Sequence, residues 1–446
     1  MENQEQNSWV KTSITLKLLI VGVLVLLFLI PSLMIRSLIS ERESTSMNVV
    51  NEISSKWGNS QTITGPMVSI PYKIHVKDSN YRTTMISYIN VLPEDLNING
   101  NLTPEIRYRS MYNVIVYKAE LKIDGEFKKP NLDEFKINPD DILWNDAFIT
   151  VGIPDMRGIN KQIAIQWNNR NLEVSPGTIT KDMIASGVTA KIGKWQDTAY
   201  RFTLNLDING SETLFFAPLG KETKVDLVST WETPKFDGAF LPDTKTIDKS
   251  GFKAHWEVLH LNRNYPQQWI GANYEFNSSS FGVKLLMGVD QYQKVMRAAK
   301  YAIMFIALTF LVFLFTEILN KYRIHPVQYL LVGLGLSIFY TLLLSFSEHI
   351  GFNASYLISS VAIIGLISLY ANSIFKNIRL TMLMTAILLV LYAFLFTILQ
   401  LEDYSLLFGS IGLFIVLAVI MYLSRKVDWY SEGKKTHFLE EDNTTE

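Results

Sequence analysis

Six long apolar runs stand out along the chain, separated by polar stretches. One lies near the N-terminus at 14–35, and five follow in the last third at 301–319, 327–347, 356–375, 380–401 and 404–423. A helix of roughly 20 apolar residues crosses the ~30 Å hydrocarbon core of a bilayer. The pattern therefore predicts a bundle of six transmembrane helices, one before and five after a large intervening segment.

The first run is either a cleaved signal peptide or an anchor that stays attached. It is longer than the apolar region of a signal peptide, which covers about 7–15 residues, and no Ala-x-Ala pattern follows it. We expect an uncleaved signal anchor, preceded by a short cytoplasmic segment at 1–13.

Residues 36–300 show a different periodicity, close to two. Every odd position from Ile115 to Ile123 is apolar, whereas Lys118, Glu120 and Lys122 occupy even positions. This alternation is typical of a strand with one buried face. The segment is expected to be a mainly antiparallel β domain, built as one large sandwich or two smaller ones. The polar stretch at 131–146 is the candidate divider.

Turn signals interrupt the alternating runs. Asn99-Gly100, Asp124-Gly125 and Asn209-Gly210 each stand beside apolar alternation, and such pairs tolerate the positive φ angles of tight hairpins. The sequence predicts hairpins at all three. Helical periodicity appears in this segment only beside the membrane, at 37–57 and 291–300.

Charge separates the two regions further. Only 8 of the 124 residues at 301–424 are charged, against 61 of the 265 residues at 36–300. The first block is too apolar for a water-facing surface, and the second is large enough to form its own core. The net charge of the chain is -1, which provides no basic field for nucleic acid. The absence of cysteine excludes disulfides and thiolate sites.

The loops of the five-span block carry basic residues at one end and acidic residues at the other. The basic loop residues are Lys321, Arg323, Lys376 and Arg379. Because cytoplasmic loops are enriched in lysine and arginine, we expect both termini, including the tail at 425–446, in the cytoplasm and 36–300 on the opposite side of the membrane. Arg36 and Arg42, at the outer end of the first span, oppose this orientation but are outweighed by the loops.

Common catalytic motifs are missing from the chain, including the phosphate-binding Gly-x-x-x-x-Gly-Lys-Ser/Thr loop, Gly-x-Ser-x-Gly and His-Glu-x-x-His. His255 and His260 are five residues apart, which on a strand places them on opposite faces. The aromatic residues are better explained by core packing and interfacial belts, with Tyr329 as one belt residue, than by a glycan- or lipid-binding groove. We expect no catalytic residue, cofactor or metal.

Four ionisable residues lie near the ends of the predicted spans: Glu317, His325, Glu348 and His349. Buried ionisable groups in a membrane are costly and tend to mark proton or ion paths. None of the four is near the middle of a span, so the sequence favours interfacial positions where their polar ends reach water. They remain candidate functional residues.

Several ordered segments resemble one known family. They include Leu29-Ile-Pro-Ser-Leu-Met-Ile-Arg36, Asp155-Met-Arg-Gly158, Gly251-Phe-Lys-Ala-His-Trp256, Asp290-Gln-Tyr-Gln293, His325-Pro-Val-Gln-Tyr-Leu-Leu-Val-Gly333 and Ser347-Glu-His-Ile-Gly-Phe352. In these segments the chain resembles the CreD family. The matches run from about residue 25 to 430 and are sparsest at 72–150 and 179–230.

The resemblance implies a bacterial inner-membrane protein, typically controlled by a two-component regulator and linked to envelope integrity and stress. It implies no catalytic residue. The leading prediction is therefore a non-enzymatic envelope-integrity protein whose periplasmic domain binds an envelope glycan, lipid or protein. The alternatives are a transporter or flippase component and a membrane-anchored periplasmic hydrolase. The lipid bilayer is an expected partner, nucleic acid is not, and the oligomeric state stays open.

The segment 290–300 joins the predicted β domain to the five-span block and is rich in family-like residues. We hypothesise that it is a short rigid coupler, with Asp290 and Arg297 as its candidate residues. Arg297 and Lys300 are placed where lipid phosphates could hold them.

Overall fold

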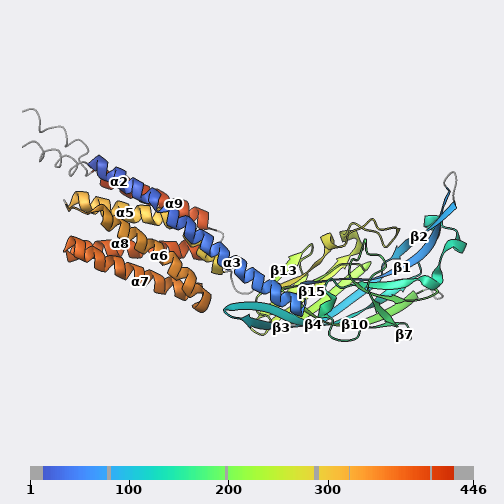
Figure 1. The fold of residues 1–446 in the computed structure, drawn as a ribbon. Coiled ribbons are helices and arrows are strands. Elements are labelled where there is room, and N and C mark those ends of the chain that lie inside the picture. Colours follow the sequence, from blue (N-terminus) through green and yellow to red (C-terminus); the bar gives the residue numbers. More distant parts are fainter. Residues whose placement is uncertain are drawn as a thin grey trace, which may run out of the picture. The chain divides into compact units, whose positions relative to one another are not determined.

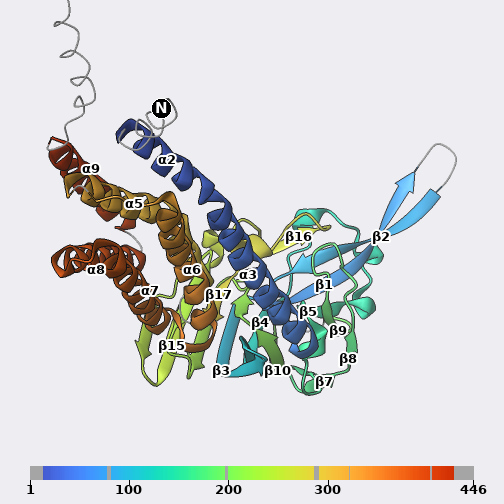
Figure 2. The same ribbon diagram turned by 60° about the vertical axis from the view of Figure 1, so that its left-hand side comes forward.

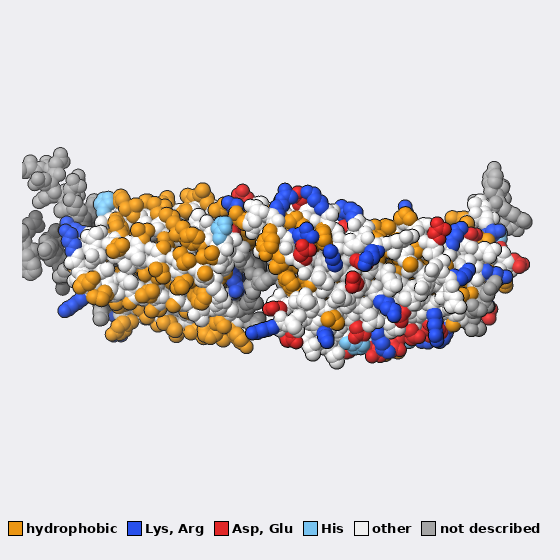
Figure 3. All heavy atoms as spheres, turned by 90° about the horizontal axis from the view of Figure 1, so that it is seen from below, with side chains coloured by type: hydrophobic (Ala, Val, Ile, Leu, Met, Phe, Trp, Pro, Cys, Tyr) orange, Lys and Arg blue, Asp and Glu red, His pale blue; other side chains and the backbone are white. Residues whose placement is uncertain are grey.

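The computed structural model describes residues 14–77, 82–195, 199–285, 291–320, 322–401 and 404–425. The chain divides into two compact units (Figure 1). The helical unit combines Met1–Thr45 with Asp290–Glu446, and the β unit is Ser46–Val289. Hydrophobic side chains cover much of the visible surface of the helical unit, whereas charged side chains are spread over the β unit (Figure 3).

The helical unit is built from long apolar helices and one short amphipathic helix. The helices are α2 (Ile14–Leu27), α3 (Leu29–Trp57), α4 (Gln291–Lys300), α5 (Ala302–Leu319), α6 (Pro326–Ile350), α7 (Phe352–Phe375), α8 (Ile378–Gln400) and α9 (Ser405–Ser424). The residues of α3 from Ser46 on belong to the β unit. Among the described residues, six helical stretches, counting α2 with α3 as one, are long and apolar enough to cross a membrane. The predicted arrangement of one plus five spans is confirmed.

The first span is interrupted at Phe28, between α2 and α3. Pro31 lacks an amide hydrogen, so the carbonyl of Leu27 loses its usual helical partner at this point. The Phe28 ring turns inward and lies edge-on to Phe310, with ring centroids 5.8 Å apart. Gly333 makes room for this ring, because a Cβ atom there would lie 2.3 Å from it.

The β unit consists of two sheets with mainly antiparallel pairing. The nine-stranded sheet contains β1 (Gln61–Lys77), β2 (Arg82–Val91), β5 (Phe148–Gly152), β8 (Val174–Pro176), β9 (Gly187–Lys191), β11 (Thr213–Phe216), β13 (Pro234–Gly238), β16 (Gln268–Ile270) and β17 (Phe281–Leu285). The eight-stranded sheet contains β3 (Asp95–Arg109), β4 (Tyr112–Lys128), β6 (Ala164–Trp167), β7 (Arg170–Leu172), β10 (Ala199–Ser211), β12 (Glu222–Ser229), β14 (Thr244–Asp248) and β15 (Gly251–Leu259). Figure 2 shows the β1–β2 ribbon extending away from the rest of the unit.

One hydrophobic core fills the space between the two sheets. Its members include Met67 and Val151 from the nine-stranded sheet and Leu121 and Trp256 from the eight-stranded sheet. Of the two alternatives, one large sandwich or two smaller ones, the structure has the first, and the candidate divider at 131–146 does not separate sub-domains. It forms three short 3-10 helices, and its apolar side chains pack against the same core.

All three predicted hairpin turns are also wrong. Asn99-Gly100, Asp124-Gly125 and Asn209-Gly210 lie inside the long strands β3, β4 and β10. Their glycines are needed for close packing rather than for turning. A Cβ atom on Gly100 would lie 2.5 Å from the Leu227 side chain. The true turn between β3 and β4 is formed by Ser110 and Met111, with Ser110 at a φ of 55°.

Candidate functional site

The carboxylate of Glu317 connects three segments of the helical unit. Its Oε1 accepts hydrogen bonds from Lys17 Nζ of α2 at 2.7 Å and from the backbone amide of Ile324 at 3.3 Å. Its Oε2 accepts one from the Tyr329 hydroxyl of α6 at 2.9 Å. Glu317 is only 2% exposed. A single buried charge therefore joins the first span to the end of α5 and the start of α6.

These contacts correct two predictions. Glu317 was expected at an interfacial position with its carboxylate in water, but Lys17 reaches it from a helix 300 residues away in the chain. Tyr329 was expected in an aromatic belt, but it is buried and donates its hydroxyl hydrogen to Glu317. A buried carboxylate needs a cation and hydrogen-bond donors, and the side chains of Lys17 and Tyr329 supply them together with the backbone amide of Ile324.

A pocket of about 470 Å³ lies beside this cluster. Its polar lining includes Lys17, Glu317, Arg323 and His325. His325 also begins α6, because its Nδ1 accepts a hydrogen bond from the backbone amide of Val327 at 3.3 Å. The structure thus brings together two of the residues singled out from the sequence, Glu317 and His325, and adds Lys17, Tyr329 and Arg323.

The other predicted candidates are dispersed. Glu348 is half-buried and accepts a hydrogen bond from the Tyr292 hydroxyl at 3.1 Å, while His349 is exposed. Arg297 Nη2 lies 3.4 Å from the carbonyl oxygen of Ile398 and 3.3 Å from that of Leu401, so it donates to the end of α8. Cations are favourable at a helix C-terminus. Asp290 lies outside the described residues, and the coupler hypothesis for 290–300 stays a prediction.

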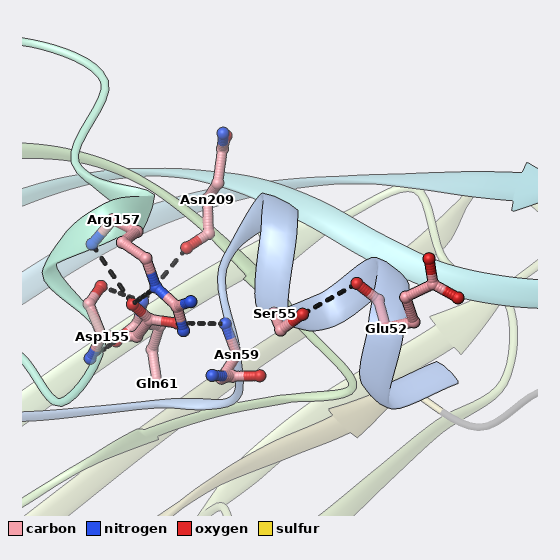
Figure 4. A network of polar contacts seen from close by, with 7 residues as sticks. All are labelled: Glu52, Ser55, Asn59, Gln61, Asp155, Arg157 and Asn209. Carbon is pink, nitrogen blue, oxygen red and sulfur yellow. Dashed lines mark hydrogen bonds and ion pairs between the residues drawn. The ribbon is translucent and has the colours of Figure 1, made fainter. Parts of the chain in front are cut away.

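The β unit holds its own buried carboxylate, Asp155 (Figure 4). Its Oδ2 accepts the backbone amide of Asn59, just after α3, at 2.9 Å. Arg157 donates from Nε and Nη2, both at 2.8 Å. The Arg157 guanidinium, helped by the two backbone amides, lowers the pKa of Asp155 against the opposing effect of burial. Position 58 requires glycine, because a Cβ atom there would lie only 2.6 Å from the carbonyl oxygen of Asn209.

The outer face of the eight-stranded sheet is polar across five strands. Strand register places its side chains in three rows: Glu257, Lys224, Asn97, Asp124 and Thr203; His255, Asp226, Asn99, Lys122 and Asn205; and Lys253, Val228, Asn101, Glu120 and Asp207. Fourteen of these fifteen positions are polar, Val228 being the exception. We refer to them as the polar face.

Two adjoining hollows of about 660 and 590 Å³ lie over the polar face, and Lys122 lines both. Several of the surrounding charges are paired. His255 Nδ1 lies 2.8 Å from Asp226 Oδ1, and Lys161 Nζ lies 2.6 Å from Asp207 Oδ2. Within the described residues, no group of three or more histidine, aspartate or glutamate side chains is placed to hold a metal ion.

Comparison with known proteins now identifies the family. The sequence profile described as "Inner membrane protein CreD" matches residues 13–430, nearly the whole chain. The chain belongs to the CreD family. The inner membrane protein CreD of Escherichia coli (strain K12) is 34% identical to it over 417 residues, which cover 91% of this chain and 92% of that protein. The resemblance found in the sequence is confirmed, and this CreD-family chain is a multi-pass inner-membrane protein.

Sequence reasoning missed the pairing of Lys17 with Glu317, although a signal was present. Lys17 is a charge in the first turns of an apolar run, and Glu317 is an acid near the end of another. Opposite charges inside two apolar spans favour a partnership when the spans are adjacent. The match between Asp155-Met-Arg-Gly158 and the family gave no indication that Asp155 is buried.

Proposed function

We propose that this protein maintains the integrity of the cell envelope, with its β unit on the periplasmic side binding a polar envelope component without chemically changing it. The single observation that supports the binding role is the polar face with its two hollows. The envelope role rests on the resemblance to the CreD family. The orientation rests on the basic loops at one end of the spans.

The chemistry of the polar face favours a glycan over an acyl chain. Amide, carboxylate and ammonium groups such as those of Asn99, Asp226 and Lys122 match the hydroxyl, amide and carboxyl groups of an envelope glycan. Large aromatic side chains of the unit, such as Trp256 and Trp167, are buried in the core. Recognition on this face is therefore expected to depend on hydrogen bonds rather than on stacking.

A buried aromatic cluster in the helical unit favours this role over a carrier role. Phe339, Tyr356 and Tyr392 pack together there, and the Tyr356 hydroxyl donates to the backbone oxygen of Tyr392 at 2.7 Å. All three rings are buried, and the Tyr356 hydroxyl is bonded inside the protein, so these positions do not line a polar cavity. A hydrolase would rely on the Asp226–His255 pair. The experiment below distinguishes a hydrolase from a binding protein, because a hydrolase cleaves its ligand.

Co-sedimentation of the purified full-length protein with peptidoglycan sacculi tests the proposal. We expect binding, and we expect the Asn99→Ala/Lys122→Ala variant to lose affinity at least about tenfold, because each hydrogen bond contributes ~1 kcal/mol and bonds from charged groups contribute more. Lys249→Ala, an exposed lysine outside the polar face, is the matched control. Equal binding by all three proteins contradicts the glycan site, and release of soluble fragments from the sacculi indicates hydrolysis.

A reporter fused midway through 36–300 tests the orientation separately. A periplasmic reporter such as alkaline phosphatase is expected to be active there. Activity only of a cytoplasmic reporter at the same position would remove the β unit from the envelope side of the membrane and overturn the proposal.

A further inference from the structure

We propose that the pocket beside Glu317 binds the head group of an anionic phospholipid. The pocket lies where α2 begins, α5 ends and α6 begins, so it is at the end of three membrane-crossing segments. Its volume of about 470 Å³ is within the roughly 300–1,000 Å³ range of small-ligand sites. Basic pockets between transmembrane helices are a recurrent way of holding anionic head groups.

The charge of the pocket is positive at its mouth. Glu317 is already satisfied by Lys17, by the amide of Ile324 and by the Tyr329 hydroxyl. Its negative charge is therefore balanced inside the cluster. Arg323 and His325 are exposed, and within the described part of the chain Arg323 has no ion-pair partner. A phosphate at the mouth would give the Arg323 guanidinium the planar, two-pronged acceptor that it prefers.

The walls of the pocket fit an acyl chain rather than a soluble anion. Ile20 and Val21 of α2 and Leu314 of α5 line it, and most of the lining surface is apolar. Only 17% of the apolar window in the first span is buried inside the protein, so most of that helix is free to contact lipid. A free phosphate ion gains nothing from these walls, whereas a phospholipid contacts both the cationic mouth and the apolar wall.

Titration of the full-length protein in detergent tests this inference. The probes are phosphatidylglycerol, phosphatidylcholine and inorganic phosphate, and the readouts are the unfolding temperature and the lipid adducts seen by native mass spectrometry. We expect phosphatidylglycerol to bind and stabilise the protein more than phosphatidylcholine, and inorganic phosphate to have no effect. Equal effects of the two lipids, or full stabilisation by inorganic phosphate alone, overturn the lipid site.

Variants locate the site within the bundle. Arg323→Gln is expected to weaken phosphatidylglycerol binding about fivefold, the factor that one surface cation contributes at a membrane. His325→Asn should weaken it less, and asparagine preserves the start of α6 because it is a favoured helix N-cap. Arg379→Gln removes an exposed arginine from the first turn of α8, outside the pocket, and serves as the control. Unchanged affinity in Arg323→Gln, or an equal loss in Arg379→Gln, contradicts the proposal.

Discussion

Two buried carboxylates, Glu317 in the helical unit and Asp155 in the β unit, perform the same task in different surroundings. They are 2% and 7% exposed, and each is bound by a cation and by at least one backbone amide. Each also binds a group from the N-terminal part of the chain that lies in the same unit. Glu317 binds Lys17 of α2, and Asp155 binds the amide of Asn59 directly after α3.

The two sites differ in how well water and the remaining hydrogen-bond donors can stabilise the carboxylate after the cation is removed. The Arg157 side chain is 59% exposed, so water reaches its end of the ion pair. Asp155 also keeps two backbone amide donors, those of Asn59 and Arg157, when the guanidinium is removed. The Lys17 side chain is 30% exposed, about half as much as that of Arg157, and Glu317 keeps one backbone amide and the Tyr329 hydroxyl as donors when the ammonium is removed. The ion pair in the helical unit is the less solvated of the two, so it is expected to be more costly to break.

Replacement of Lys17 in the helical unit is expected to cause the largest loss of stability. Lys17→Met leaves the Glu317 carboxylate buried without its partner, which costs ~3–5 kcal/mol. We expect a large fall in the thermal unfolding temperature of the detergent-solubilised protein. Lys376→Met, which removes an exposed lysine between α7 and α8, is the matched control and should change little.

A second substitution distinguishes lost charge balance from lost packing. Lys17→Met/Glu317→Gln removes both charges, so most of the stability should return. If Lys17→Met alone unfolds at the wild-type temperature, Glu317 does not depend on this partner. The ion pair in the helical unit is then no more costly to break than the one in the β unit.

Replacement of Asp155 in the β unit is expected to cause the second-largest loss of stability. Asp155→Ala leaves the part-buried amide of Asn59 without its acceptor, and an unsatisfied buried donor costs ~1–3 kcal/mol. Arg157→Ala should cost clearly less than Asp155→Ala, because its end of the pair is solvated. Denaturant unfolding of the full-length variants measures both. An equally large loss in Arg157→Ala would show that the two sites are alike.

The membrane spans were predictable because their signal is local. A run such as 380–401 carries its own evidence of burial in lipid, and α8 covers Ile378–Gln400. The Glu317 cluster depends instead on Lys17, and only the packing of α2 against α5 brings the two together. Tyr329 was misread for the same reason, since an aromatic residue near a span end fits an interfacial belt until its partner is known.

Strand interiors explain the errors in the β unit. An Asn-Gly pair such as Asn209-Gly210 is a strong hairpin signal by itself. In the structure, a Cβ atom on Gly210 would lie 2.3 Å from the Tyr117 hydroxyl, so the glycine is required by a side chain on the neighbouring strand. An Asn-Gly pair occurs both in hairpin turns and at places where a neighbouring side chain packs closely against the backbone. The strand pairing that separates the two is not visible in a single stretch of sequence.

The dependence of stability on pH is the smallest expected effect and tests whether Asp155 is charged. Its pKa in the folded protein is lowered chiefly by Arg157, below the value of about 3.9 for an unfolded aspartate. Its contribution to the free energy of unfolding is thus complete above about pH 4 and is lost as the pH falls through the folded pKa. Asp207, whose pKa is lowered chiefly by Lys161, behaves in the same direction.

The Asp155→Asn variant removes one titrating carboxyl group, so it measures how much this group contributes to the loss of stability in acid. Removal of one titrating group makes the curve of unfolding free energy against pH shallower by up to ~1.4 kcal/mol per pH unit below pH 4. The stability gap between wild type and Asp155→Asn should therefore be widest near pH 7 and should narrow between pH 4 and 2.5. Unfolding of both proteins across this range measures the gap. A gap that stays constant down to pH 2.5 would mean that Asp155 contributes through hydrogen-bond geometry alone, and its parallel with the Lys17–Glu317 ion pair would then be lost.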